Sequence, residues 1–130
     1  MGKKKAVKTN NPDALKEAGN KAFAQKKYTE AVKQYTMAIE ISQETPNHIY
    51  FANRANAYLE MGLFEECIAD CNQAMQIDPM FPKSYYRKAK AQVNIQKLTD
   101  ALETLKAGLE QNPDNEDFKT MMANTAEEIQ

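Results

Sequence analysis

Two basic residues, Lys83 and Arg87, lie four positions apart in the stretch PKSYYRKAKAQ, which also contains Lys88 and Lys90. If this stretch is a helix, Lys83 and Arg87 stack on one face of it. Like charges in that relation cost a helix roughly 0.2–0.5 kcal/mol. An anion bound between the two side chains would remove this repulsion, so the pair is a candidate anion-binding site.

The other side chains that often carry chemistry do not form a reactive set. Cys67 and Cys71 are too few for a structural zinc site and too close for a disulfide framework, so we expect them on a buried helix face. His48 is the only histidine and falls in the turn-like stretch ETPNHIY. We find no Ser-His-Asp combination, no metal-ligand cluster and no glycine-rich phosphate loop. The sequence therefore predicts no enzyme activity, no metal site and no cofactor.

The bulk composition limits the kinds of partner. The 130 residues suit one domain, and 17 Lys and Arg against 18 Asp and Glu give a net charge of −1. This balance favours neither nucleic acid nor membrane as a partner. No apolar run approaches the roughly 18 residues of a membrane span, and none follows the N-terminal lysines as in a signal peptide. We expect a cytoplasmic monomer with a mobile basic tail at residues 1–10 and one domain at 11–130.

The chain repeats itself. A shift of 34 residues places Ala55 over Ala89 and Pro79 over Pro113, and a shift of 36 places Gly19 over Ala55. Three small residues recur in each copy, where they let two antiparallel helices approach closely. They are Gly19, Ala31 and Ala38, then Ala55, Cys67 and Ala74, then Ala89, Ala101 and Gly108.

Each copy shows two stretches with apolar residues at three- and four-residue spacing, which predicts paired helices. The predicted helices are 12–25, 28–42, 47–61, 64–77, 82–95 and 98–111. Proline-containing segments separate the pairs. A last segment has an apolar stripe on one side and polar residues elsewhere, as in a helix that covers the open end of a repeat stack. The stripe is Phe118, Met121, Met122, Thr125 and Ile129.

The helix-turn-helix period, the small residues and the closing prolines resemble the tetratricopeptide repeat family over about residues 12–113. This resemblance implies an all-α fold, a right-handed superhelical solenoid of three repeats with a C-terminal capping helix. The repeats would cover about 12–45, 48–81 and 82–113, and the capping helix about 114–129.

Three stretches, LKEAGNKAF, YFANRANAY and PKSYYRKA, resemble the carboxylate-clamp repeats of Hop-type chaperone-organising co-chaperones. The clamp positions of that group match Lys16, Asn20, Asn53, Lys83 and Arg87. The resemblance implies a groove that binds the extreme C-terminus of seventy- or ninety-kilodalton heat-shock chaperones, which end in Glu-Glu-Val-Asp. It also implies that Lys16, Asn20 and Asn53 hold the main-chain carboxylate, that Lys83 meets the terminal Asp side chain, and that Arg87 binds groups upstream.

Helical geometry gives these five donors a common direction. Lys16 and Asn20 share a face of the first helix, as Lys83 and Arg87 do on the fifth. The apolar stripes lie on other sides, through Leu15, Ala18 and Ala22 and through Tyr85, Ala89 and Val93. Because the first helix of each pair lines the concave side of a superhelix, the donors should meet in one groove. Three positive charges there suit two carboxylates better than one, and a chain end in Asp or Glu supplies two.

Residues one turn from the clamp are predicted to contact earlier residues of a bound peptide. This second set is Phe23, Asn56, Leu59, Lys90, Ala91 and Asn94. We expect Arg54 and Lys88 to bury their stems and keep their charged ends in water. We expect Tyr85 and Tyr86 to serve packing.

A second interpretation stays open. The repeats could be a scaffold that binds another protein through the convex face, with the clamp residues incidental. Within the first interpretation, the sequence does not decide which of the two chaperone classes is preferred.

Overall fold

The computed structural model describes residues 11–129, which form seven α-helices and no strand. The helices are α1 (Pro12–Ala24), α2 (Tyr28–Ile41), α3 (His48–Glu60), α4 (Phe64–Ile77), α5 (Pro82–Asn94), α6 (Leu98–Gln111) and α7 (Glu116–Ile129). The six helices predicted from periodicity agree with α1 to α6 to within one residue at each end. The predicted basic tail, residues 1–10, lies outside the described part of the chain.

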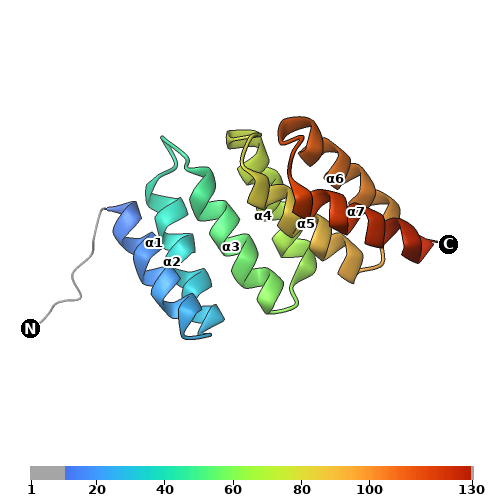
Figure 1. Cartoon of the computed structure of the whole chain (residues 1–130). Coiled ribbons are helices and arrows are strands. Elements are labelled where there is room, and N and C mark those ends of the chain that lie inside the picture. The colour runs from blue at the N-terminus through green and yellow to red at the C-terminus, as the bar shows by residue number, and fades with distance from the viewer. Residues whose placement is uncertain (1–10, 130) are drawn as a thin grey trace, which may run out of the picture.

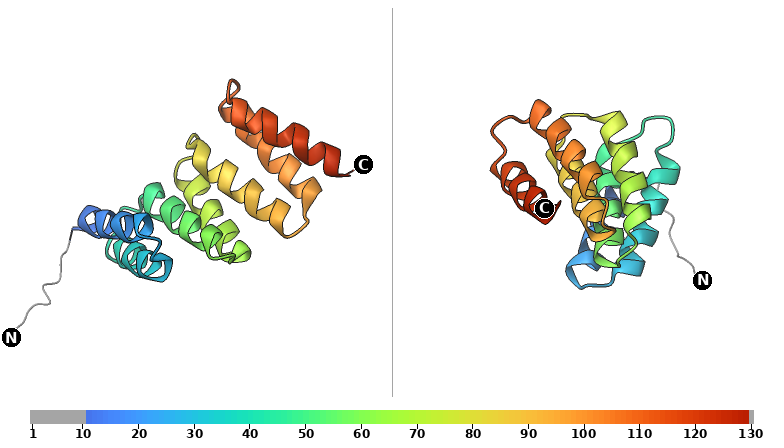
Figure 2. Two further views of the ribbon diagram at one scale, coloured as in Figure 1. Left: turned by 60° about the horizontal axis from the view of Figure 1, so that its bottom comes forward. Right: turned by 90° about the vertical axis from the view of Figure 1, so that its right-hand side faces the viewer.

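The helices form a curved stack that runs in chain order from α1 to α7 (Figures 1 and 2). Each helix packs antiparallel to the next one along the chain, within a repeat and between repeats. In addition, the backbones of α1 and α3, of α3 and α5, and of α5 and α7 approach each other, whereas over residues 11–129 those of α2, α4 and α6 do not. The row whose members touch lies on the inside of the bend. The odd-numbered helices therefore form the concave face, as the resemblance implied.

The nine recurring small residues are all buried. Two of them have no room for even one more carbon. A Cβ added to Gly19 would lie 2.4 Å from Cε1 of Tyr35, and one added to Gly108 would lie 2.8 Å from Cε2 of Phe118. These contacts show that small residues allow close approach of α1 and α2 at Gly19 and of α6 and α7 at Gly108.

The capping helix α7 begins two residues later than the predicted start at 114. The side chain of Asn115 accepts a hydrogen bond of 3.0 Å from the backbone N–H of Phe118, so Asn115 acts as the N-cap and the preceding residues belong to the turn. Phe118 and Thr125 are buried against the last repeat, as predicted. Ile129 is 48% exposed, so its predicted place on the buried stripe is wrong; it is the last residue of α7.

Arg54 does not keep its charged end in water, so that prediction is wrong. Its Nε and Nη2 donate hydrogen bonds of 2.7 and 2.8 Å to the two carboxylate oxygens of Asp70, and its Nη1 donates to Thr36 Oγ1 at 3.0 Å. The rings of Phe51 and Tyr58 lie within 6 Å of the guanidinium carbon. Asp70 is only 4% exposed. This buried ion pair ties α2, α3 and α4 together.

The buried stripe of α1 runs through Leu15, Gly19 and Ala22, and the prediction that Ala18 lies on it is wrong. The equivalent position in the second repeat is Arg54, which is covered because it packs between α2 and α4. Among the described residues no helix precedes α1, so the same flank of α1 faces solvent.

The two cysteines and the histidine have well-defined surroundings in the structure. Cys67 and Cys71 are both buried and free, as expected. His48 lies in the first turn of α3, where its Nε2 is 3.3 Å from Asp78 Oδ2 and its ring packs on Phe81. Within the described residues, no group of three or more metal-ligating side chains gathers, and no helix is both long and apolar enough to cross a membrane.

The turn inside each repeat places one residue in the left-handed region of backbone space. These residues are Lys26, Gly62 and Gln96, with φ of 62°, 76° and 63°. They occupy equivalent positions, related by the same shifts of 36 and 34. Only glycine adopts this conformation without steric cost, so the first and third turns carry strain that the second does not.

We expect Lys26→Gly and Gln96→Gly each to raise the free energy of unfolding by about 0.5–1 kcal/mol. The substitution removes a backbone strain of roughly 1–2 kcal/mol. Glycine also makes the unfolded chain more flexible, which destabilises the folded state by only about 0.4–1 kcal/mol. Urea unfolding measures both variants, with Gly62→Ala as the matched control, which should lose stability. Glycine variants less stable than the parent would contradict this account of the turns.

Candidate functional site

Two cavities lie on the concave face, and four of the five predicted clamp residues line them. The smaller cavity, of about 180 Å³, lies between α1 and α3. Its lining residues are Asn20, Phe23, Ala24, Tyr35, Asn53 and Asn56. It brings together two amides that are 33 positions apart in the chain.

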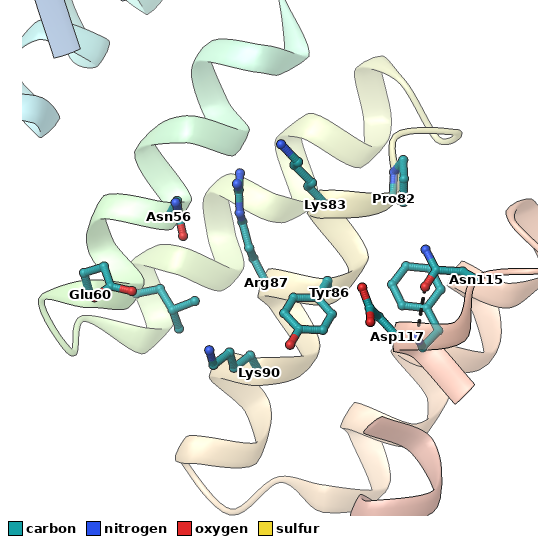
Figure 3. A pocket seen from close by; sticks show the side chains of 11 residues that line it. Asn56, Glu60, Pro82, Lys83, Tyr86, Arg87, Lys90, Asn115 and Asp117 are labelled. Atoms are coloured by element: carbon teal, nitrogen blue, oxygen red, sulfur yellow. Dashed lines mark hydrogen bonds between the residues drawn. The ribbon is translucent and has the colours of Figure 1, made fainter. Parts of the chain in front are cut away.

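The larger cavity, of about 450 Å³, is bounded by α3, α5 and α7. Its lining residues are Asn56, Leu59, Glu60, Pro82, Lys83, Tyr86, Arg87, Lys90, Asn115, Asp117 and Phe118. Figure 3 shows Lys83, Arg87 and Lys90 projecting from α5, with Asn56 and Glu60 across from them on α3. Asn56 lines both cavities, so together they form one groove that crosses the concave face. We call this the concave groove.

The amides of Asn20 and Asn53 are joined directly. Asn53 Nδ2 donates to Asn20 Oδ1 at 3.2 Å, and the Tyr35 hydroxyl donates to the same oxygen at 2.6 Å. Because Asn20 Oδ1 is occupied from the protein side, the N–H groups of Asn20 are the part of this amide left for a ligand. This end of the groove is a donor site.

The cation pair Lys83 and Arg87 lies where the sequence places it, on one face of α5. Among residues 11–129, no carboxylate oxygen lies within 4.0 Å of the charged nitrogens of Lys83 or Arg87. Arg87 Nη1 donates to the backbone oxygen of Ala52 at 2.8 Å, which holds the guanidinium against α3. Burial lowers the pKa of Arg87 from its ordinary value. The groove thus holds a poorly hydrated positive charge without a counter-ion in the described structure.

Lys16 is the clamp residue that lines neither cavity. It lies one helical turn before Asn20 on α1, and its side chain is 24% exposed. Its Nζ is 3.6 Å from Glu17 Oε2 and 4.0 Å from Asp13 Oδ1. In this state Lys16 faces acids of its own helix, and it would have to turn from them to reach a ligand beside Asn20.

The six residues predicted to contact earlier residues of a bound peptide do not all lie in the groove. Phe23, Asn56, Leu59 and Lys90 line the groove. Ala91 is fully buried against Cys67 and Cys71 of α4, so its predicted contact with a peptide is wrong. Ala91 follows Lys90 by one residue, about 100° around the helix, which places it on the buried side of α5, whereas Lys90 faces the groove. Asn94 is exposed, lies outside both cavities, and donates to Lys90 O at 2.9 Å.

Sequence reasoning missed several groove residues. Tyr86, predicted to serve packing, lines the larger cavity, while Tyr85 is buried as expected. Glu60 places an acid in the groove, and α7 contributes Asp117 as a second one. A capping helix continues the row of odd-numbered helices, and that row lines the groove. The place of α7 in the row could therefore have predicted that it forms a wall of the groove. Tyr35 reaches the groove from α2 and carried no such signal.

Comparison with known proteins gives consistent matches. The family model described as "Tetratricopeptide repeat" matches residues 58–125. The "Hsp70-Hsp90 organizing protein 2" of Arabidopsis thaliana is 35% identical over 106 residues, which are 82% of this chain and 18% of that protein. "Serine/threonine-protein phosphatase T" of Aspergillus oryzae is 38% identical over 110 residues, 85% of this chain and 23% of that protein. The chain spans less than a quarter of either relative.

Solved structures of peptide complexes share the fold. One is described as the first TPR of Spaghetti (RPAP3) bound to the HSP90 peptide SRMEEVD; it has a TM-score of 0.84 and 31% identity, and the match covers 95% of this chain and 98% of that one. Another is the TPR2B-domain:pHsp70-complex of yeast Sti1, with a TM-score of 0.82 and 31% identity, covering 90% and 97%. Both support the all-α solenoid.

Proposed function

The chain belongs to the tetratricopeptide repeat family, and from this premise we propose that it is a non-catalytic module that binds the C-terminal tail of heat-shock chaperones. The ligand in this proposal is an extended peptide ending in Glu-Glu-Val-Asp with a free carboxylate. The observation that carries it is the concave groove, where Lys83 and Arg87 form no ion pair among residues 11–129 and share one groove with the donor pair of Asn20 and Asn53.

The chemistry of the groove matches such a tail better than a neutral one. Arg87 is held in a poorly hydrated place, where charge-assisted hydrogen bonds contribute about 1.5–3 kcal/mol each. A terminal Asp offers two carboxylates a few ångströms apart, which can meet both the amide end and the cationic part of the groove. The relatives named for Hsp70 and Hsp90, and the complexes with HSP90 and Hsp70 peptides, support this class of ligand.

We propose the following division of roles along the groove. Asn20 and Asn53, with Lys16 turned away from Glu17, hold the main-chain carboxylate. Lys83 meets the side chain of the terminal Asp, and Arg87 binds groups just upstream. The larger cavity then takes earlier residues of the peptide, and Phe23, Asn56, Leu59 and Lys90 contact them. Such a partner class implies a cytoplasmic protein.

A calorimetric titration tests the proposal, using a peptide that ends in Glu-Glu-Val-Asp as the free acid and as the C-terminal amide. We expect micromolar binding of the free acid, a binding free energy of about −7 to −8 kcal/mol. The affinity is limited because only a few charge pairs would be buried in the complex. Amidation removes one of the two carboxylates and should weaken binding at least tenfold, about 1.4 kcal/mol. Added salt should weaken the free-acid complex, because the groove is open to solvent.

The variant Lys83→Ala should also lose about 1.5–3 kcal/mol of binding free energy. Lys106→Ala is the matched control, because Lys106 is an exposed lysine on α6, outside the groove. Equal binding of the two peptide forms would show that the groove does not recognise the terminal carboxylate. Binding that Lys83→Ala leaves unchanged would favour a scaffold that uses another face.

A further inference from the structure

Within residues 11–129, Tyr35 is the one groove residue that comes from the outer row of helices. It lies on α2, is 2% exposed, and reaches between α1 and α3 to the smaller cavity. Its ring is held directly against Gly19, where an added Cβ would lie 2.4–2.9 Å from three ring carbons. Burial raises the pKa of Tyr35 to about 12, so the hydroxyl stays protonated at neutral pH. It donates at 2.6 Å to Asn20 Oδ1.

The direction of the Asn20 amide decides whether it can bind an anion. One end of an asparagine amide carries two donors and the other end is an acceptor. A carboxylate is attracted by the first and repelled by the second. In this structure Oδ1 of Asn20 accepts from both Tyr35 and Asn53 Nδ2, at 2.6 and 3.2 Å, which uses the two lone pairs of that oxygen. The Nδ2 group is therefore free to face the groove.

We propose that Tyr35 is a positioning residue for carboxylate binding, which fixes the Asn20 amide with its N–H groups toward the ligand before the ligand arrives. This inference rests on the proposed function. A rigid ring on Gly19 places the hydroxyl, and its donation to Oδ1 stabilises the amide orientation seen in the structure. Removing the hydroxyl lets Asn20 populate the orientation that repels the ligand, so part of the binding free energy is spent on reorientation.

The test is Tyr35→Phe, which keeps the ring and removes only the donor. Loss of one such hydrogen bond should lower the affinity for the free-acid peptide roughly two- to tenfold. The matched control is Tyr85→Phe, because Tyr85 is also buried and its hydroxyl donates at 2.8 Å to Pro79 O, a backbone oxygen in the loop between α4 and α5. We expect that control to bind as the wild type does, even if both variants lose similar thermal stability.

A double-mutant cycle separates positioning from general loosening. In an Asn20→Ala background the amide is gone, so Tyr35→Phe should cause no further loss of affinity. A wild-type protein that does not bind the free-acid peptide would overturn the proposed function and this inference together. A wild type that binds, with an unchanged Tyr35→Phe variant or an equal loss in the Asn20→Ala background, would overturn the inference alone.

If Tyr35→Phe does not fold, a measurement on the wild-type protein still tests the inference. Its Tyr35 hydroxyl proton should exchange slowly with water and show a nuclear Overhauser contact with the side-chain amide of Asn20. A hydroxyl proton in fast exchange would overturn the inference.

Discussion

Replacing Asp70 by alanine is expected to lower the free energy of unfolding by about 3–5 kcal/mol, the largest loss we expect from a single substitution in this protein. Asp70 is 4% exposed and accepts both hydrogen bonds of the Arg54 fork. Without it, the Arg54 guanidinium would remain near the rings of Phe51 and Tyr58 without its hydrogen-bonded counter-ion. Chemical denaturation monitored by circular dichroism measures the loss.

Two controls distinguish the ion pair from simple loss of packing. In the double variant Arg54→Met with Asp70→Ala, no unpaired charge is left, so the loss should be clearly smaller than the sum of the single losses. Lys119→Ala breaks an exposed pair with Glu116 and should change stability by no more than about 0.5 kcal/mol. Additive losses at Arg54 and Asp70 would contradict a buried, coupled pair.

The variant Arg87→Met is expected to lose about 1.5–3 kcal/mol of binding free energy for the free-acid peptide, roughly 10- to 150-fold in affinity, and to keep its stability. Methionine retains much of the apolar stem while removing the charge. Because burial lowers the pKa of Arg87, the folded state disfavours this charge, and its removal relieves that cost. The lost hydrogen bond to Ala52 O offsets part of the gain. Calorimetry and thermal unfolding measure the two effects.

Arg54→Met is the matched control for this prediction. Arg54 and Arg87 are both partly buried arginines on first helices, but only Arg87 lines the groove. We expect Arg54→Met to lose stability, and the folded fraction to bind peptide with little change. An Arg87→Met variant that binds normally, or that loses as much stability as Arg54→Met, would show that Arg87 serves the fold instead of a ligand.

The fold was predictable because the same helix-turn-helix unit occurs three times in the sequence. Positions such as Ala55 and Ala89 mark the close approach of two helices in every copy, and three copies make the register unambiguous. Two of the errors lie at the ends of the helix stack, where the repetition stops. Ala18 is exposed because no helix precedes α1 in the described chain, and Ile129 is exposed at the last residue of α7.

The site was predictable only in part, because helical spacing locates a face and not a neighbour. Lys83, Arg87 and Lys90 share one face of α5, and the structure places them in one cavity. Ala91 lies only one position further and is buried, since a single residue turns the helix by about 100°. Asp117 and Tyr35 enter the groove through contacts between segments far apart in the chain, which one-dimensional periodicity does not encode.

The central claim is that a chain end with two carboxylates binds in the concave groove. A nitrogen-proton NMR titration that follows side-chain amides tests it most directly, because Asn20, Asn53 and Asn56 each supply a reporter inside the groove. We predict large shifts of the Asn20 and Asn53 side-chain signals with the free-acid peptide, much smaller ones with the amidated peptide, and little change at Asn72 on α4. Shifts confined to α2, α4 and α6, or the same shifts with both peptides, would contradict the claim.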